Sequence, residues 1–318
     1  MNSRLTGVLF FSVLVFSACI FSSLPVRAET TTGCPFGIEE DQFWVRTSHK
    51  MVDMTEKYDR QSDSMVPLPD GWYKQVDTSS FRLGYGLSDS WEIGLLFIER
   101  NINQKTFNKK TKTWTEIHDG GIGDTWLALG YKFLEEEDWG GFDEAYMKLG
   151  LGYKSDALQT LSDREILRGV GNGAREMKLV FLSHEVLGKL AFCNHLTYHW
   201  RGSAPVIPGS KLSGQNLTDR LNYKFNLEYE LSEEWAASVG LFGWMDVQKI
   251  SFASKFKDKG MDGQKAHMHR LVFSLEKSLG EDKYGHKKLK LAYGIPYSVK
   301  NGMAPDYDIT LIAMYTWP

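Results

Sequence analysis

Hydrophobic and polar residues alternate along much of this chain with a period of two, which is typical of β-strands. The last segment shows the pattern most clearly. In YDITLIAMYTW every second residue from Tyr307 to Trp317 is apolar or aromatic. Aromatic residues stand at its two ends and aliphatic residues in its middle, as expected where a strand crosses a bilayer. The pattern therefore predicts a strand with one face toward lipid.

The same alternation recurs along the chain. It predicts strands at about 41–59, 72–87, 90–104, 115–134, 144–155, 173–186, 189–201, 219–231, 235–250, 264–279, 286–299 and 307–317. The links between them alternate between five short and six long ones, the long ones being 60–71, 105–114, 156–172, 202–218, 251–263 and 300–306. In outer-membrane barrels the short turns face the periplasm. We therefore expect an all-β fold, a single antiparallel transmembrane β-barrel of about 12 strands with both termini periplasmic.

The N-terminus has the pattern of a secretory signal peptide. Arg4 precedes an apolar core, and a small-residue cleavage pattern ends at Ala28. A second motif, Phe16-Ser17-Ala18-Cys19, loosely resembles a lipoprotein cleavage site, so lipidation at Cys19 is an alternative. The predicted organisation is a signal peptide at 1–28, an N-terminal periplasmic segment at 29–40 and the barrel at 41–318.

Composition agrees with a barrel and argues against other classes. The chain has 13% aromatic residues, which fits interfacial girdles of Trp and Tyr. Its mean hydropathy is only −0.33, but alternate residues alone face lipid in a barrel. A net charge of −3 argues against a nucleic-acid partner. Cys34 and Cys193 could form a disulfide in an exported protein.

The alternation along each predicted strand also assigns the charged side chains to one of its two faces. The apolar parity of the predicted strands carries residues such as Leu83, Leu129 and Leu291, and the opposite parity carries charges. A lysine or arginine facing lipid at the bilayer midplane would cost about 2–4 kcal/mol, so the charged parity should line the lumen. The predicted lumen-lining residues are Arg82, Glu92, Arg100, Asp124, Lys132, Lys148, Lys154, Lys224, Glu228, Asp246, Lys290 and Asp308. The segment 173–186 is apolar on both parities, and its faces cannot be assigned.

These lumen residues leave two interpretations open. They can line a solute path, or they can fill a closed interior with ion pairs. Basic residues outnumber acidic ones among the twelve, so an open path should prefer anions weakly.

Two motifs carry a family resemblance. Residues 121–133, GIGDTWLALGYKF, follow the hairpin sequence YGLSDSWEIG at 85–94. Together they resemble outer-membrane proteins of the MetA-pathway-of-phenol-degradation-like, or putative "transporter", family, over roughly residues 80–155. The resemblance implies a barrel that admits small organic compounds. The glycines at 121 and 123 also have a structural interpretation, since they relieve crowding in the wall while Asp124 faces inward.

No catalytic residue is predicted. Ser183 and His184 are adjacent and so point to opposite faces of a strand. Ser274 and Ser298 have no histidine at an obvious neighbouring depth, and no G-x-S-x-G motif occurs. A lipid-acting outer-membrane enzyme and a closed structural or surface-interaction barrel remain as alternatives.

No metal site or cofactor is predicted either. His195 and His199 are four residues apart in one strand, a rise of about 13 Å. His267 and His269 could chelate, but their parity faces lipid. The basic segments 104–112 and 255–259 would contact phosphate groups of lipopolysaccharide, which makes outer-membrane lipids and lipopolysaccharide the expected partners beside an unidentified small solute.

Overall fold

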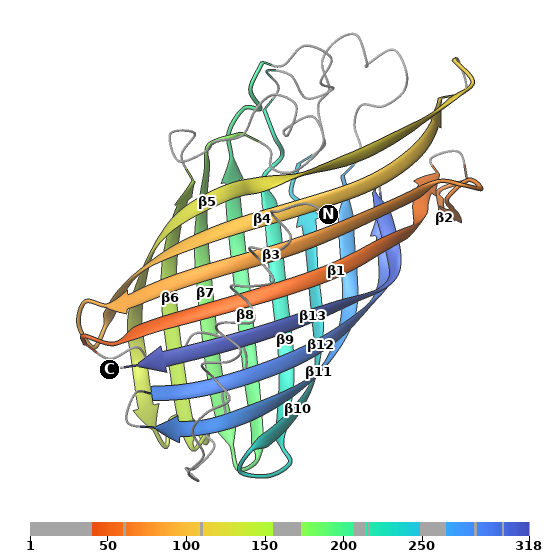
Figure 1. Ribbon diagram of the computed structural model, residues 1–318. Coiled ribbons are helices and arrows are strands. Elements are labelled where there is room, and N and C mark those ends of the chain that lie inside the picture. The colour runs from red at the N-terminus through yellow and green to blue at the C-terminus, as the bar shows by residue number, and fades with distance from the viewer. Residues whose placement is uncertain are drawn as a thin grey trace.

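A computed structural model describes residues 40–59, 62–108, 111–154, 173–206, 214, 216–248, 265–282, 285–300 and 302–317. These residues form a single antiparallel sheet that closes into a barrel (Figure 1). The strands are β1 (Phe43–Asp59), β2 (Ser64–Pro67), β3 (Tyr73–Gly86), β4 (Trp91–Asn108), β5 (Thr113–Glu137), β6 (Glu144–Lys154), β7 (Glu176–Leu187), β8 (Leu190–Arg201), β9 (Arg220–Glu230), β10 (Trp235–Asp246), β11 (His267–Asp282), β12 (Gly285–Lys300) and β13 (Met303–Trp317).

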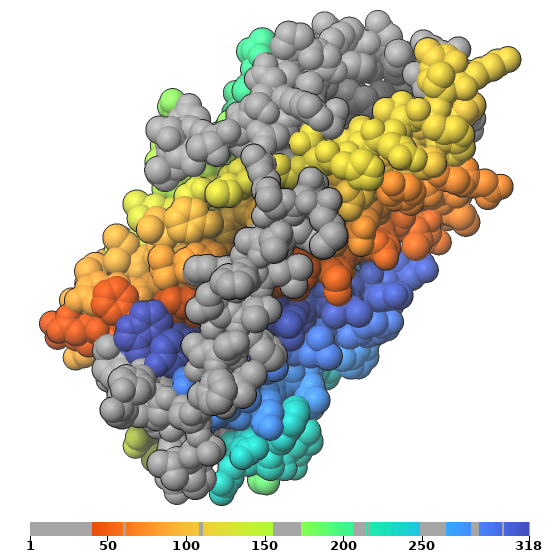
Figure 2. Space-filling view, viewed as in Figure 1, coloured from red at the N-terminus to blue at the C-terminus, as the bar shows by residue number. Residues whose placement is uncertain are grey.

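Twelve strands make the wall, and the first and last of them close it. Each wall strand pairs with its neighbour in sequence, while β1 pairs with both β3 and β13. Phe43 lies opposite Trp317 at one end of this closing pair. Figure 2 shows the same closure from outside, where the orange and blue side chains from the two ends of the chain lie side by side. The predicted twelve-stranded antiparallel barrel is confirmed, with β2 as a short addition that pairs with β1.

The strand register places the alternate apolar residues, which were predicted to face lipid, on the outside of the barrel. Trp91, Ile93 and Leu95 lie opposite Tyr131, Leu129 and Leu127, and all six side chains are 37–44% exposed. Aromatic rings gather at the ends of the strands, as with Trp91 and Tyr131, whose ring centroids lie 4.7 Å apart. A closed barrel with such an apolar belt between aromatic rims belongs in the outer membrane. Among the described residues none forms a helix long and apolar enough to cross a bilayer.

The sequence does not show which residues of the predicted strand 173–186 face lipid. The pairing of β7 with β6 shows it. Met177 and Leu179 on β7 lie opposite Tyr153 and Leu151, which are on the outer face. Leu182 therefore faces the interior and is buried.

Several predicted loops are strands instead. The predicted link 105–114 lies largely within paired β4 and β5, which continue to Asn108 and Thr113. β13 begins at Met303, inside the predicted link 300–306. In the described residues β6 pairs with β5 only as far as Leu127, so the first half of β5 and the end of β4 form an arm beyond the wall (Figure 1). Apolar and polar residues do not alternate in this arm, because both of its faces meet water. The sequence pattern therefore does not predict these parts of the strands.

The motif GIGD coincides with a β-bulge. Thr125 pairs with Phe97, whereas Ile122 pairs with Glu99, so β5 has one extra residue between these two pairs. A bulge re-aims nearby side chains. Ile122 before the bulge is accordingly 55% exposed, whereas Asp124 keeps the inward parity of Trp126 and contacts Lys154. The predicted inward direction of Asp124 agrees with this contact.

Some predictions fall outside the described residues. These are the signal peptide, lipidation at Cys19, nearly all of the segment 29–40 with Cys34, and the basic segment 255–259. Cys193 faces the interior and is 3% exposed. Its bridge to Cys34 remains a prediction, as does the periplasmic position of the chain ends.

Candidate functional site

The candidate site is the inner face of the barrel. Each of the twelve residues predicted to line the lumen lies on the face opposite the apolar belt, since the belt residues alternate with them in the strand registers. Asp124 shares the inward parity of Trp126 and Ala128, and the bulge in β5 changes the parity only from Ile122 backward. Most of these side chains belong to ion-pair networks that join neighbouring strands.

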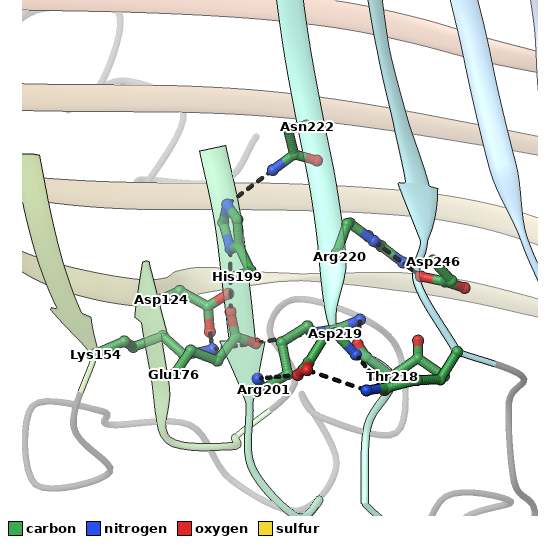
Figure 3. Close-up of polar contacts among 11 residues, drawn as sticks. Asp124, Lys154, Glu176, His199, Arg201, Thr218, Asp219, Arg220, Asn222 and Asp246 are labelled. Atoms are coloured by element: carbon green, nitrogen blue, oxygen red, sulfur yellow. Dashed lines mark hydrogen bonds and ion pairs between the residues drawn. The ribbon is translucent and has the colours of Figure 1, made fainter. Parts of the chain in front are cut away.

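The largest network lies where β5 to β10 reach the long-loop end of the barrel (Figure 3). Lys154 on β6 is fully buried, and its Nζ lies 3.1 Å from Asp124 Oδ1 and 3.2 Å from Glu176 Oε1. Glu176 also accepts a hydrogen bond from Arg201 Nε at 3.4 Å. A buried ammonium needs such carboxylates around it, because taking a charge out of water is costly.

His199 on β8 and Asn222 on β9 extend this network to the next strands of the wall. His199 Nδ1 lies 3.7 Å from Glu176 Oε2, and its Nε2 lies 2.7 Å from Asn222 Nδ2. Beside it, Arg220 donates two hydrogen bonds to Asp246 Oδ1 at 3.0 and 3.1 Å. The guanidinium of Arg220 also stacks on Trp244, 3.9 Å from the ring centroid. The charges are thus held in fixed positions on β8, β9 and β10 (Figure 3).

Two smaller clusters lie elsewhere on the inner face. Asp308 Oδ2 on β13 lies 3.0 Å from Lys50 Nζ and 2.6 Å from Arg270 Nη1. Lys290 Nζ on β12 lies 3.4 Å from Glu276 Oε2 and 3.6 Å from Glu228 Oε2. Both clusters have carboxylates that are less than a tenth exposed.

A fourth contact shows how glycines make room for charged side chains. Lys148 on β6 forms an ion pair with Glu92 on β4, two strands away. The pair reaches across Gly130 on the intervening strand, where a Cβ atom would lie 2.4 Å from Lys148 Cε. A side chain at this position would therefore require Lys148 and Glu92 to move.

The remaining predicted residues lie apart from these clusters. Lys132 contacts Glu135 on its own strand. Arg82 lies opposite Arg46, Arg100 opposite Thr78, and Lys224 between His195 and Phe242.

Sequence reasoning missed several inner-face residues. Glu176, Arg201, Arg220, Arg270, Glu276 and Lys50 all take part in the ion pairs above. Glu276 could have been found, since it has the parity opposite to that of the belt residues Phe273 and Leu275 of the same strand. Glu176 could not, because it opens the strand whose two faces are both apolar.

One prediction about serine and histidine is wrong. Ser298 does have a histidine neighbour, since its Oγ lies 2.9 Å from His267 Nε2. The register shift between β11 and β12 near Pro296 makes the two residues diagonal neighbours on the outer face. No described carboxylate or amide bonds to the His267 ring, which instead stacks on His269 with centroids 4.7 Å apart. The third group of a catalytic triad is therefore missing from the described residues.

No group of three or more potential metal ligands lies together in the described ranges. His267 and His269 are outer-face residues, as their parity predicts. The absence of a cofactor remains a prediction.

Comparisons with known proteins give a structural likeness without a sequence match. No family model matches the chain, and no curated protein matches it. The COG4313 outer membrane channel from Pseudomonas putida F1 aligns over 91% of this chain and 100% of that chain, with a TM-score of 0.65 and 14% identity. The CymD monoaromatic hydrocarbon channel aligns over 88% of this chain and 89% of that chain, with a TM-score of 0.42 and 10% identity. A Pseudomonas aeruginosa FadL homologue aligns over 88% and 90%, with a TM-score of 0.41 and 8% identity. The first of these shows that the chain has the fold of an outer-membrane channel, the kind of barrel that the sequence resemblance implies.

Proposed function

We propose that this barrel lets a small solute pass passively across the outer membrane. The observation that supports this most is the division of the wall into two faces. The outer face is an apolar belt, whereas the inner face carries charged side chains held in ion pairs along the length of the strands. Polar groups on the inside of a barrel favour a water-filled path from one end to the other.

The size of the barrel fits a narrow path. Barrels of eight strands are filled by their own side chains, and barrels of sixteen strands leave an aqueous channel. Twelve strands lie between these cases. On the inner face Lys224 is exposed, and Arg46, Arg82 and Lys178 are partly exposed, so solvent reaches these side chains.

The path should prefer anions weakly. Many of the basic residues that suggest this preference are neutralised by carboxylates, as Lys148, Lys154 and Lys290 are. Basic residues nevertheless outnumber acidic ones, seven to five, among the twelve predicted lumen residues, and a positive lining favours anions over cations. The structural likeness to an outer-membrane channel supports the same function.

A lipid-acting enzyme is the weaker candidate. The Ser298–His267 pair faces the lipid side and lacks a described third group to orient the ring. A serine nucleophile needs a base that is itself oriented. The other alternative is a closed structural barrel. Such a barrel would pass no solute, so a measurement of solute passage distinguishes it from the proposed function.

Solute passage can be tested by liposome swelling with the mature chain, residues 29–318. Two cysteine variants distinguish the lumen from the lipid face, Thr310→Cys on the inner parity of β13 and Ile309→Cys on the outer parity, both with Cys34→Ser and Cys193→Ser. We expect small sugars and organic acids to cause swelling. A charged, water-soluble thiol reagent should slow swelling with Thr310→Cys and leave Ile309→Cys unchanged. Liposomes that never swell would contradict the proposal.

A further inference from the structure

The arm formed by the end of β4 and the first half of β5 carries aromatic rings on its outer face. Trp114 on β5 lies opposite Phe107 on β4, with ring centroids 5.2 Å apart. Tyr73, at the start of β3, lies in the next row of the sheet opposite Lys105, which shares the face of the belt residue Leu95. Trp114 is 48% exposed and Tyr73 is 41% exposed. We refer to Tyr73, Phe107 and Trp114 as the arm aromatic cluster.

This cluster lies beyond the lipid-facing belt (Figure 1). On β3 and β4 the belt ends at Phe81 and Phe97, which pair with each other. The outer-face residues that follow are polar, namely Ser79, Asp77 and Gln75 on β3 and Glu99, Asn101 and Asn103 on β4. Ten residues separate Phe97 from Phe107, which is ~33 Å along a strand. At a strand tilt of about 45° this rise is ~23 Å along the membrane normal, whereas the headgroups on one side of a bilayer take up only ~5–8 Å. The rings are therefore too far out to belong to the aromatic girdle of the belt.

Trp114 is held in place although half of it is exposed. Its ring lies against the turn before β3, where a Cβ atom on Gly71 would be 2.7 Å from Trp114 Cη2. Gly71 has a φ of +76°, a conformation that glycine adopts without strain. On β4, Lys105 Nζ lies 5.4 Å from the centroid of the Trp114 ring. A ring that is fixed in this way loses little conformational freedom when a ligand binds to it.

A row of polar side chains crosses the same face beside the rings. His118 Nδ1 lies 3.0 Å from Asn103 Oδ1, and the Asn103 amide donates a hydrogen bond to Gln75 Oε1 at 3.3 Å. We refer to Gln75, Asn103 and His118 as the amide row. A primary amide has two N–H donors and an acceptor oxygen, so each of these amides can bond to a further partner. Between the amide row and the rings, Lys105 Nζ lies 2.6 Å from Glu116 Oε1.

A saccharide fits this combination of rings and polar groups. Sugar rings present C–H groups on their faces, which pack against aromatic side chains, and hydroxyl groups at their edges, which donate and accept hydrogen bonds. An apolar partner would cover the rings but would also take water away from the neighbouring amides and ion pair, which is costly. The outer face points away from the lumen, so it meets the molecules that surround the barrel rather than a solute inside it.

We propose that the arm aromatic cluster and the amide row bind the saccharide of lipopolysaccharide molecules beside the barrel. In the predicted orientation the long-loop end lies outside the cell, where this saccharide surrounds an outer-membrane barrel. Trp114 would pack against a sugar ring, and Asn103 would bond to its hydroxyl groups. The inference goes beyond solute passage and does not depend on it. It also differs from the phosphate contacts predicted for the segment 104–112, because Lys105 of that segment is paired with Glu116.

Binding can be measured by calorimetry on the detergent-solubilised chain lacking residues 1–28. One probe is the deacylated core oligosaccharide of lipopolysaccharide, and the other is lipid A, which has the acyl chains and phosphates without the core sugars. We expect the core oligosaccharide to bind, and the double variant Tyr73→Ala with Trp114→Ala to weaken its binding about tenfold or more, because the ring contacts are lost. Trp114→Phe keeps a ring and should retain most of the affinity. Asn103→Leu keeps the volume of the side chain but removes its hydrogen bonds, and should also weaken binding.

The matched control is Trp235→Ala. Trp235 is also an exposed outer-face ring beside a lysine, with Lys277 Nζ 5.2 Å from its centroid, but it lies at the short-turn end of the barrel. This variant should bind the core oligosaccharide as the parent does. Heat-dependent migration in gels shows whether each variant is folded, and if the double variant is not, Asn103→Leu tests the inference by itself.

Two results would overturn the inference. One is a core oligosaccharide that does not bind, or that binds equally to the parent, the double variant and Asn103→Leu. The other is binding of lipid A without binding of the core oligosaccharide, because the sugars would then contribute nothing. A barrel that binds the core oligosaccharide but passes no solute would count only against the proposed function.

Discussion

Replacement of Lys290 by methionine should destabilise the barrel strongly. This lysine lies between two carboxylates, with its Nζ 3.6 Å from Glu228 Oε2 and 3.4 Å from Glu276 Oε2. Its side chain is 11% exposed, and those of Glu228 and Glu276 are 1% and 9% exposed. Both carboxylate oxygens of Glu228 lack a hydrogen-bond partner. The ion pairs with Lys290 are therefore important for keeping this charge in the interior.

The magnitude follows from the burial. Removing one partner of a buried ion pair typically costs about 3–5 kcal/mol, because an uncompensated charge stays behind. Lys290→Met should lower the free energy of unfolding by about that amount, toward the lower end because Lys288 also acts on Glu228. Neutralising the carboxylate as well, in Lys290→Met with Glu228→Gln, should recover part of the loss.

Urea unfolding in detergent micelles, followed by tryptophan fluorescence and by heat-dependent migration in gels, measures the effect. The matched control is Lys105→Met, which breaks the exposed pair of Lys105 and Glu116 and should cost far less, because exposed ion pairs contribute little to stability. A loss of stability for Lys290→Met no larger than for the control would refute the reasoning. So would a double variant that is less stable than Lys290→Met alone.

Other perturbations test packing and the lipid-facing belt. Gly84→Ala should cost about 1–3 kcal/mol of unfolding free energy, because the new methyl group would collide with the Trp44 indole. Gly150→Ala, whose Cβ atom would meet Val180 at an ordinary 3.4 Å, should cost clearly less in the same urea titration. Leu241→Arg, on the outer face of β10, should cost about 2–4 kcal/mol in lipid vesicles, and Trp235→Arg at the end of that strand about 0–1 kcal/mol. Equal costs at these two depths would show that the belt does not span the bilayer as described.

The wall of the barrel could be predicted from sequence because lipid imposes a strict rule. A polar residue facing lipid is costly, so belt residues such as Leu127 and Leu241 recur at every second position. That rule gave the strands, their number and the face of each predicted lumen residue. The rule predicts nothing where both faces of a strand meet water. The arm formed by β4 and β5 was therefore expected to be a loop.

The arrangement of the lumen could be predicted only in part. Parity shows that Lys154 and Asp124 face inward, but their contact with each other and with Glu176 depends on the registers of β5, β6 and β7. Apolar residues are also tolerated inside, as Leu182 is, and they hide the face of the strand that carries Glu176. The contact between Ser298 and His267 depends on another register shift, which no local pattern indicates.

Single-channel recording in a planar bilayer, with the purified chain lacking residues 1–28, shows most directly whether solute passes through the lumen. We expect discrete, stable conductance steps, with a reversal potential in a salt gradient that shows a weak preference for anions. A folded, heat-modifiable barrel that inserts but gives no steps in any salt or solute would contradict solute passage through the lumen.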